Sequence, residues 1–101
     1  MCGISGILNM NKKKITLKKK IKTMNKILKH RGPDGNGIWI NKKSYIGFGH
    51  TRLSIIDLDK RASQPMISGD IVVTFNGEIY NYDDLKSKLI NWKFKSTSDT
   101  E

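Results

Sequence analysis

The chain has 101 residues, of which 37% are hydrophobic and 28% charged, and it carries a formal net charge of +10. These values predict one small folded domain and argue against a disordered chain. No apolar run reaches the roughly 20 residues of a membrane span, no secretory signal pattern is visible, and one cysteine cannot form an internal disulfide. We therefore expect a cytoplasmic location without membrane contact. We expect no metal site, since the two histidines stand apart from other ligand residues.

The N-terminus combines the only cysteine of the chain with a predicted strand. Ile4 to Leu8 form a short apolar run between glycines, which favours a buried strand. Cys2 would stand at the start of that strand. A cysteine at a free N-terminus carries its own α-amine, with a pKa of roughly 7.7–8.0, as a base beside its thiol. From Cys2 alone, we would favour an inert residue near the start of the chain over a catalytic one.

A lysine-rich helix is predicted next, with Thr16 as a candidate cap. Its apolar positions recur at helical spacing: Leu17, Ile21, Met24 and Leu28, with Ile27 beside them. The lysines on the other face raise nucleic acid as a partner. Because arginines and interleaved aromatic residues are few, we favour a solvated helix face over a nucleic-acid site.

A turn and a hairpin follow the helix. Residues 32–37 combine proline, aspartate and three glycines, which is typical of a tight turn. Ile38 to Ile40 and Tyr45 to Phe48 are β-rich runs joined by a plausible hairpin loop over 41–44. The run from Gly49 to Leu58 begins polar and becomes apolar.

Within residues 49–58, the apolar positions Leu53, Ile55 and Ile56 look buried. Arg52 stands next to them. It is either a surface salt-bridge partner or a fixed two-pronged donor for a carboxylate.

The last third of the chain begins with a predicted loop over residues 59–68. Ile71 to Phe75 predict a β-branched strand ending at Asn76-Gly77, which by itself is a tight turn. Asn81 is a good N-cap for a helix reaching residue 89 or 90, with acidic residues in its first turn.

Near the end of the chain, apolar and charged residues first alternate, and the residues that follow are polar. Trp92 to Lys95 predict another strand, and Ser98 to Glu101 resemble the opening of a further helix. Since a domain rarely stops at the start of a helix, we expect this chain to be a fragment.

Six segments in order resemble one family. They are MCGISG at 1–6, HRGPDG at 30–35, RLSIIDL at 52–58, QPM at 64–66, FNGEIYN at 75–81 and SDTE at 98–101. Together they resemble the N-terminal glutaminase domain of glutamine-hydrolysing asparagine synthetases, which are class II glutamine amidotransferases. The resemblance implies an α+β fold, the αββα sandwich of N-terminal-nucleophile hydrolases. Residues 1–101 would be a partial type-2 domain, without its C-terminal half and without the ATP-binding synthetase domain.

The resemblance also implies catalytic roles. With Met1 removed, Cys2 would attack the side-chain amide of glutamine, release ammonia and leave a γ-glutamyl thioester that water resolves to glutamate. Asn76 would offer its side-chain amide, and Gly77 its backbone N–H, to the oxyanion of the transition state.

Further residues are implied in binding glutamine. Arg52 would hold the α-carboxylate, Glu78 and Asp99 would receive the α-ammonium group, and backbone around Leu53 and Ile55 would line the pocket. Without the surrounding motifs, we would interpret Glu78 and Asp99 as an ordinary capping acid and an ordinary surface acid rather than as binding residues.

Expected partners and alternatives follow from the same resemblance. The chain itself would need no cofactor, whereas ATP and Mg²⁺ would serve the missing synthetase domain in the amidation of aspartate. Glutamine and that synthetase domain are the expected partners, and a homodimer is left open. The alternatives are an amidotransferase of the same group with another acceptor, an inactive remnant or interaction module, and a nucleic-acid-binding module.

Overall fold

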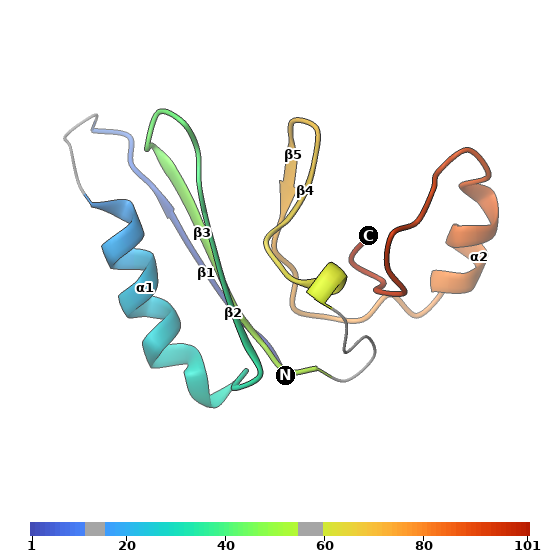
Figure 1. Cartoon of the computed structure of the whole chain (residues 1–101), viewed down its shortest axis with the longest axis horizontal. Helices are drawn as coiled ribbons and strands as arrows, with labels where there is room; N and C mark the ends of the chain where they lie inside the picture. The colour runs from blue at the N-terminus through green and yellow to red at the C-terminus, as the bar shows by residue number, and fades with distance from the viewer. Residues whose placement is uncertain (12–15, 55–59) are drawn as a thin grey trace.

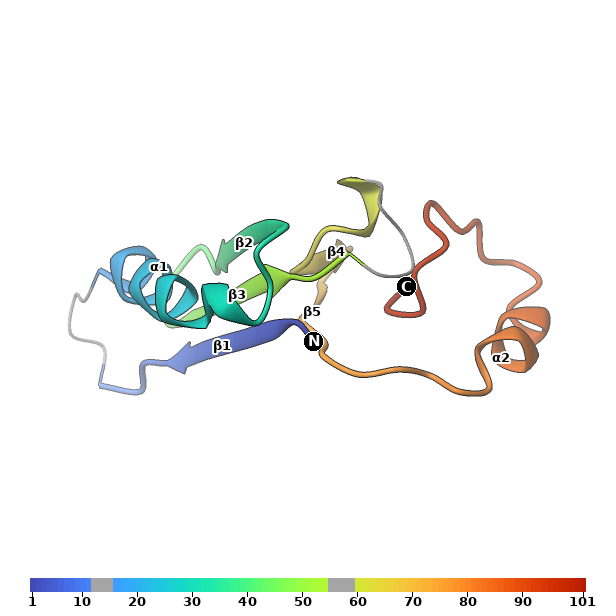
Figure 2. The same cartoon turned by 90° about the horizontal axis from the view of Figure 1, so that it is seen from below.

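The structure is a computed structural model that describes residues 1–11, 16–54 and 60–101. Its longest dimension is 45 Å. Figures 1 and 2 show helix α1 (Leu17–Ile27) with a three-stranded sheet at one end and helix α2 (Tyr82–Lys88) at the other. A two-stranded hairpin lies between them. The architecture is therefore α+β, with antiparallel sheets and two helices.

The larger sheet has β3 (Ile46–Arg52) at its centre, with β1 (Gly3–Leu8) and β2 (Gly35–Ile40) antiparallel on either side. The predicted strand near the N-terminus and the predicted hairpin are confirmed, but the strand is not buried as expected, because it lies at an edge of the sheet and leaves Ile4 and Leu8 48% and 64% exposed. However, β3 continues past Phe48 to Arg52, because both of its edges are paired there. This extension carries the chain from the sheet directly into the candidate site.

Helix α1 packs against one face of this sheet, as Figure 1 shows. Its predicted amphipathic pattern is confirmed, since Leu17 and Ile21 are 2% and 0% exposed while its lysines face solvent. Thr16 occupies the N-cap position, but its side chain makes no capping hydrogen bond. The last apolar position of the pattern, Leu28, belongs to a short 3₁₀ turn, η1 (Leu28–His30), and Ile27 at the end of α1 is 68% exposed.

A buried polar contact fixes α1 on the sheet. Asn25, which is 1% exposed, accepts a hydrogen bond from Ser5 Oγ at 2.9 Å and donates to the Gly37 carbonyl at 3.0 Å. A Cβ atom at Gly49 would collide with Asn25, Ser5 and Ile21. Glycine at this position of β3 therefore lets the helix approach the sheet closely.

The second sheet pairs β4 (Met66–Ser68) with β5 (Ile71–Val73). A short helix, η2 (Lys60–Ala62), precedes it, and Gly69 supplies the positive φ of the turn, +56°. The predicted loop over 59–68 therefore includes a strand, and the predicted strand over 71–75 ends at Val73. Asn76-Gly77 forms no hairpin turn, because the chain runs onward toward α2 (Figure 1).

Helix α2 confirms the predicted helix but stops at Lys88, and Asn81 sits at its N-cap without a side-chain capping bond. The strand predicted for residues 92–95 is wrong. At 98–101, where a helix start was predicted, the chain forms a single turn in which the Glu101 N–H donates to the Ser98 carbonyl at 3.3 Å. The backbone N–H groups of Lys95 and Ser96 instead donate to the Glu101 carboxylate, which closes residues 95–101 into a loop. In the described part of the chain, no helix is long and apolar enough to cross a membrane.

Candidate active site

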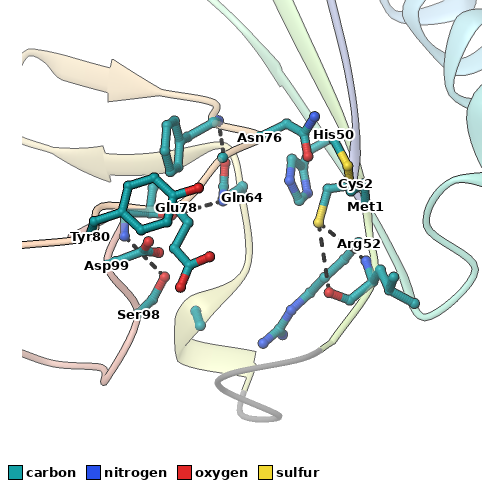
Figure 3. Close-up of a pocket in the computed structure, with 15 residues that line it drawn as sticks. Met1, Cys2, His50, Arg52, Gln64, Asn76, Glu78, Tyr80, Ser98 and Asp99 are labelled. Carbon is teal, nitrogen blue, oxygen red and sulfur yellow. Dashed lines mark hydrogen bonds between the residues drawn. The ribbon is translucent and has the colours of Figure 1, made fainter. Parts of the chain in front are cut away.

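A cleft of about 400 Å³ lies between the end of the larger sheet and the segments that follow the smaller one. It brings together seven of the residues predicted from the sequence: Cys2, Arg52, Leu53, Asn76, Gly77, Glu78 and Asp99. Ile55 lies outside the described residues. In Figure 3, Cys2 and Arg52 lie on one side of the cleft, and Glu78 and Asp99 lie on the other.

The thiol of Cys2 is held by the backbone at the end of β3. The Leu53 N–H donates to Sγ at 3.3 Å, and Sγ donates to the Leu53 carbonyl at 3.7 Å. Arg31 Nε donates to the Cys2 carbonyl at 3.2 Å. These contacts fix both the side chain and the backbone of Cys2 at the wall of the cleft.

The residue after Cys2 must be small. The Gly3 N–H donates to Thr51 Oγ1 at 3.1 Å, and the same hydroxyl donates to the Leu28 carbonyl at 3.2 Å. A Cβ atom at Gly3 would lie 2.5 Å from Thr51 Oγ1 and 2.9 Å from Leu28 Cβ. Glycine therefore allows the first strand, and with it Cys2, to sit close to β3 and η1.

The turn at residues 32–35 positions Arg52. The Asp34 N–H donates to the Arg52 carbonyl at 2.8 Å, and the Asp34 carboxylate accepts a hydrogen bond from the Ser54 N–H at 2.8 Å. A Cβ atom at Gly32 would collide with the backbone of Thr51 and Arg52. The turn thus braces the end of β3 on both sides of Leu53.

The opposite wall carries the two oxyanion candidates. Asn76 is half-buried and Gly77 is exposed. A Cβ atom at Gly77 would lie 2.7 Å from the ring of Phe75, so glycine leaves room for that ring beneath the segment. The Phe75 N–H in turn donates to Gln64 Oε1 at 2.6 Å.

Asp99 reaches the cleft from the loop that Glu101 closes. Its carboxylate accepts a hydrogen bond from the Ile79 N–H at 2.9 Å. Burial acts to raise the pKa of Glu101, but hydrogen bonds from Lys95, Ser96 and Trp92 outweigh it and hold that pKa below its usual value. Glu101 therefore stays ionised at neutral pH and keeps the loop closed.

Comparison with known proteins identifies the family to which this chain belongs. The family model described as the glutamine amidotransferase domain matches residues 1–101. The chain belongs to the glutamine amidotransferase domain family. No solved structure matches it.

Three relatives illustrate the range of names in this amidotransferase group. A Methanocaldococcus jannaschii protein, 44% identical, is provisionally named asparagine synthetase (glutamine-hydrolyzing) 2. Asparagine synthetase (glutamine-hydrolyzing) 2 of Bacillus subtilis is 43% identical, and amidase chry2 of Gibberella zeae is 36% identical. Each match covers 100% of this chain but only 22%, 14% and 17% of the respective relative.

His50 is a residue of the amidotransferase cleft that the sequence analysis missed. It is 2% exposed, and its Nε2 has no hydrogen-bond partner among the described residues. Burial lowers the pKa of His50 below 6.5; the Phe75 backbone opposes this shift and the charge of Arg52 adds to it. The imidazole is therefore neutral at neutral pH. Alternation along a strand reaching Arg52 would have placed residue 50 on the same face as Arg52.

Gln64 is the first residue of the QPM segment at 64–66, and the sequence predicted no role for its side chain. Its side chain bonds the Phe75 N–H and also donates to Thr100 Oγ1 at 3.0 Å. The described residues of this amidotransferase domain include no group of three or more His, Cys, Asp or Glu side chains suited to a metal ion.

Proposed function

We propose that this domain hydrolyses the side-chain amide of glutamine, with Cys2 as the nucleophile, and releases ammonia. The observation that carries the proposal is the composition of one cleft: a fixed thiol and Arg52 face Glu78 and Asp99 across it. An α-amino acid has a carboxylate and an ammonium group, so a cation and two anions in one cleft suit both of its charges. A volume of about 400 Å³ falls in the usual range for small-molecule sites, about 300–1,000 Å³.

The chemistry needs a free amine on Cys2. Once Met1 is cleaved off, the α-amine of Cys2 can take the thiol proton directly or through a water. The thiolate attacks the γ-carbonyl carbon, and an S–C bond forms as the carbonyl oxygen becomes an oxyanion. The C–N bond then breaks, the nitrogen takes up the proton, and ammonia leaves a γ-glutamyl thioester. Water adds to the thioester, which releases glutamate and restores the thiol.

The oxyanion would be stabilised by the Asn76 side-chain amide and the Gly77 N–H. One donor of this kind contributes about 3–4 kcal/mol to the transition state of comparable reactions. Arg52 would hold the α-carboxylate with its two-pronged guanidinium, and Asp99 with Glu78 would receive the α-ammonium group. Amides that lack these charges would leave the site's own charges unpaired, which favours glutamine over them.

The larger protein would be a glutamine-hydrolysing asparagine synthetase. On this proposal, residues 1–101 form the first half of an αββα sandwich, and the ammonia amidates an aspartate that ATP and Mg²⁺ activate in a separate synthetase domain. Two of the three relatives described carry that enzyme's name, which supports this acceptor. The relative named amidase chry2 supports a second candidate, an amidotransferase of the same group with a different acceptor.

Replacing the thiol tests the proposal. In the full-length protein, Cys2→Ala should reduce glutamine hydrolysis to background while glutamine binding and the melting temperature remain. Ser87→Ala, a small change on the exposed face of α2, is the matched control and should keep full activity. Intact mass must show loss of Met1 in the active protein. Glutamine hydrolysis that persists in the Cys2→Ala variant would refute the proposal.

A further inference from the structure

A single side chain connects the two parts of the cleft wall that follow η2. The carboxamide of Gln64 accepts from the Phe75 N–H at 2.6 Å and donates to Thr100 Oγ1 at 3.0 Å. Phe75 directly precedes Asn76, the proposed oxyanion donor, and Thr100 directly follows Asp99, the proposed acceptor of the ammonium group. Figure 3 shows Gln64 between these two segments.

The backbone of Gln64 is itself anchored to the larger sheet. A Cβ atom at Gly37 of β2 would collide with the Gln64 carbonyl and lie 3.1 Å from Pro65 Cδ. Glycine at position 37 thus lets this segment rest directly on β2. The same sheet holds Cys2 through β1 and β3. Gln64 therefore fixes the positions of both substrate-binding segments relative to the nucleophile.

The bonding roles of Gln64 are fixed by its partners. The Phe75 N–H can only donate, so the oxygen of the carboxamide must face it and the nitrogen must face Thr100. A threonine hydroxyl can accept from an amide or donate to a carboxylate. A glutamate at position 64 would therefore keep both contacts, whereas a methionine of similar length would keep neither.

We infer that Gln64 is a positioning residue that sets the separation between the carbonyl end and the ammonium end of the substrate site. This inference rests on the proposed glutaminase function. Gln64 acts through Asn76 and Asp99, and it needs no contact with the reacting atoms. Loss of both bonds affects binding and the chemical step together, since misplacement by about 1 Å can reduce a rate by about a hundredfold.

The test uses the full-length protein with Met1 removed and compares four variants at the two positions. Gln64→Met should lower kcat about tenfold and raise KM for glutamine about tenfold, because it frees both segments. Thr100→Val frees only the Asp99 loop, so it should raise KM about tenfold with kcat within about twofold of wild type. Gln64→Glu and Thr100→Ser should both stay within about threefold of wild type in kcat/KM.

A matched control and a stability measurement separate this role from simple loosening of the fold. Thr23→Val removes a hydroxyl from the exposed face of α1, where it donates to the Lys19 carbonyl of its own helix, and should leave kcat and KM unchanged. If Gln64→Met does not fold, Thr100→Val alone carries the test through its effect on KM. Unchanged KM in Thr100→Val, or a Gln64→Glu variant as impaired as Gln64→Met, would overturn the inference. A wild-type protein without glutaminase activity would instead overturn the proposed function, and this inference with it.

Discussion

The two ends of this domain hold their parts of the cleft in different ways. At the N-terminal end, Cys2 directly precedes β1 and Arg52 is the last residue of β3. Helix α1 covers one face of this sheet, and its residues Leu17 and Ile21 are buried against the strands. The C-terminal end places Asn76 on an irregular segment after β5 and Asp99 in the loop closed by Glu101, and both rely on side-chain hydrogen bonds. Cys2 is therefore held by hydrogen bonds to a sheet that is itself packed against a helix, whereas the opposite wall depends on a small number of polar contacts between loop segments.

Buried apolar side chains are also divided unevenly, although large hydrophobic residues are exposed at both ends, such as Leu8 at 64% and Ile27 at 68% before η2. Beyond η2, several large hydrophobic residues remain exposed: Ile67 at 57%, Ile71 at 72%, Leu89 at 51%, Ile90 at 84% and Trp92 at 46%. From η2 onward, Ala62 is the only apolar residue described as buried, whereas Leu17 and Ile21 are buried between α1 and the larger sheet. We therefore expect mutations at the N-terminal end to change stability first and mutations at the C-terminal end to change substrate binding first.

The largest expected effect comes from breaking the packed end. Gly32→Ala should lower the free energy of unfolding by more than about 3 kcal/mol, because the new methyl group meets the backbone of Thr51 and Arg52 and nothing there can move aside cheaply. Gly6→Ala is the matched control. Its Cβ would lie 3.4 Å from Phe48, an ordinary contact, so it should cost less than about 1 kcal/mol. Urea unfolding of both variants measures the difference, and equal stabilities would refute the account of the turn.

A smaller, more specific effect is expected at the polar wall. Asp99→Asn keeps an oxygen for the Ile79 N–H but loses the negative charge, so KM for glutamine should rise about ten- to a hundredfold with little change in melting temperature. Asp70→Asn, in the turn between β4 and β5, offers a control with the same change of charge. Steady-state kinetics distinguish the two variants. A KM unaffected by Asp99→Asn would remove Asp99 from the binding site.

The smallest expected effect is a pH dependence of stability that comes from His50, which lines the cleft between the two ends. The pKa of His50 is lowered in the folded protein, so the unfolded chain takes up a proton near pH 6.5 before the folded one does. Stability should therefore be fully present above about pH 6.5 and decline as the pH falls below it. Melting temperatures between pH 8 and pH 5 should show a shallower decline for His50→Asn than for wild type. Parallel curves would contradict a neutral, buried His50.

The candidate site was more predictable from the sequence than the fold around it. Seven of the predicted site residues line one cleft, and it was the resemblance of six ordered segments to one family that assigned them; local pattern alone made Glu78 and Asp99 a capping acid and a surface acid. Local pattern also identified α1, where one apolar stripe meets one sheet. The function of Gln64 could not be found in this way, because its two partners lie 11 and 36 residues away.

The errors have a common physical cause. The alternation of residues 92–95 resembled a strand, yet the backbone there bonds the carboxylate of Glu101, a contact that no periodicity encodes. Likewise, β4 is only three residues long and pairs with β5 through a turn at Gly69. In both places a hydrogen-bonding partner a few residues along the chain, rather than the periodicity of the segment itself, decides the backbone conformation.

The central claim is that Cys2 is the nucleophile of a glutaminase, and one measurement tests it most directly. The full-length protein without Met1 is mixed with glutamine, quenched in acid within a turnover, and its N-terminal peptide is weighed by mass spectrometry. The account predicts one γ-glutamyl group on the peptide that begins with Cys2, and none when Met1 is retained. Glutamine hydrolysis without any adduct on that peptide, under conditions that preserve a thioester, would contradict it.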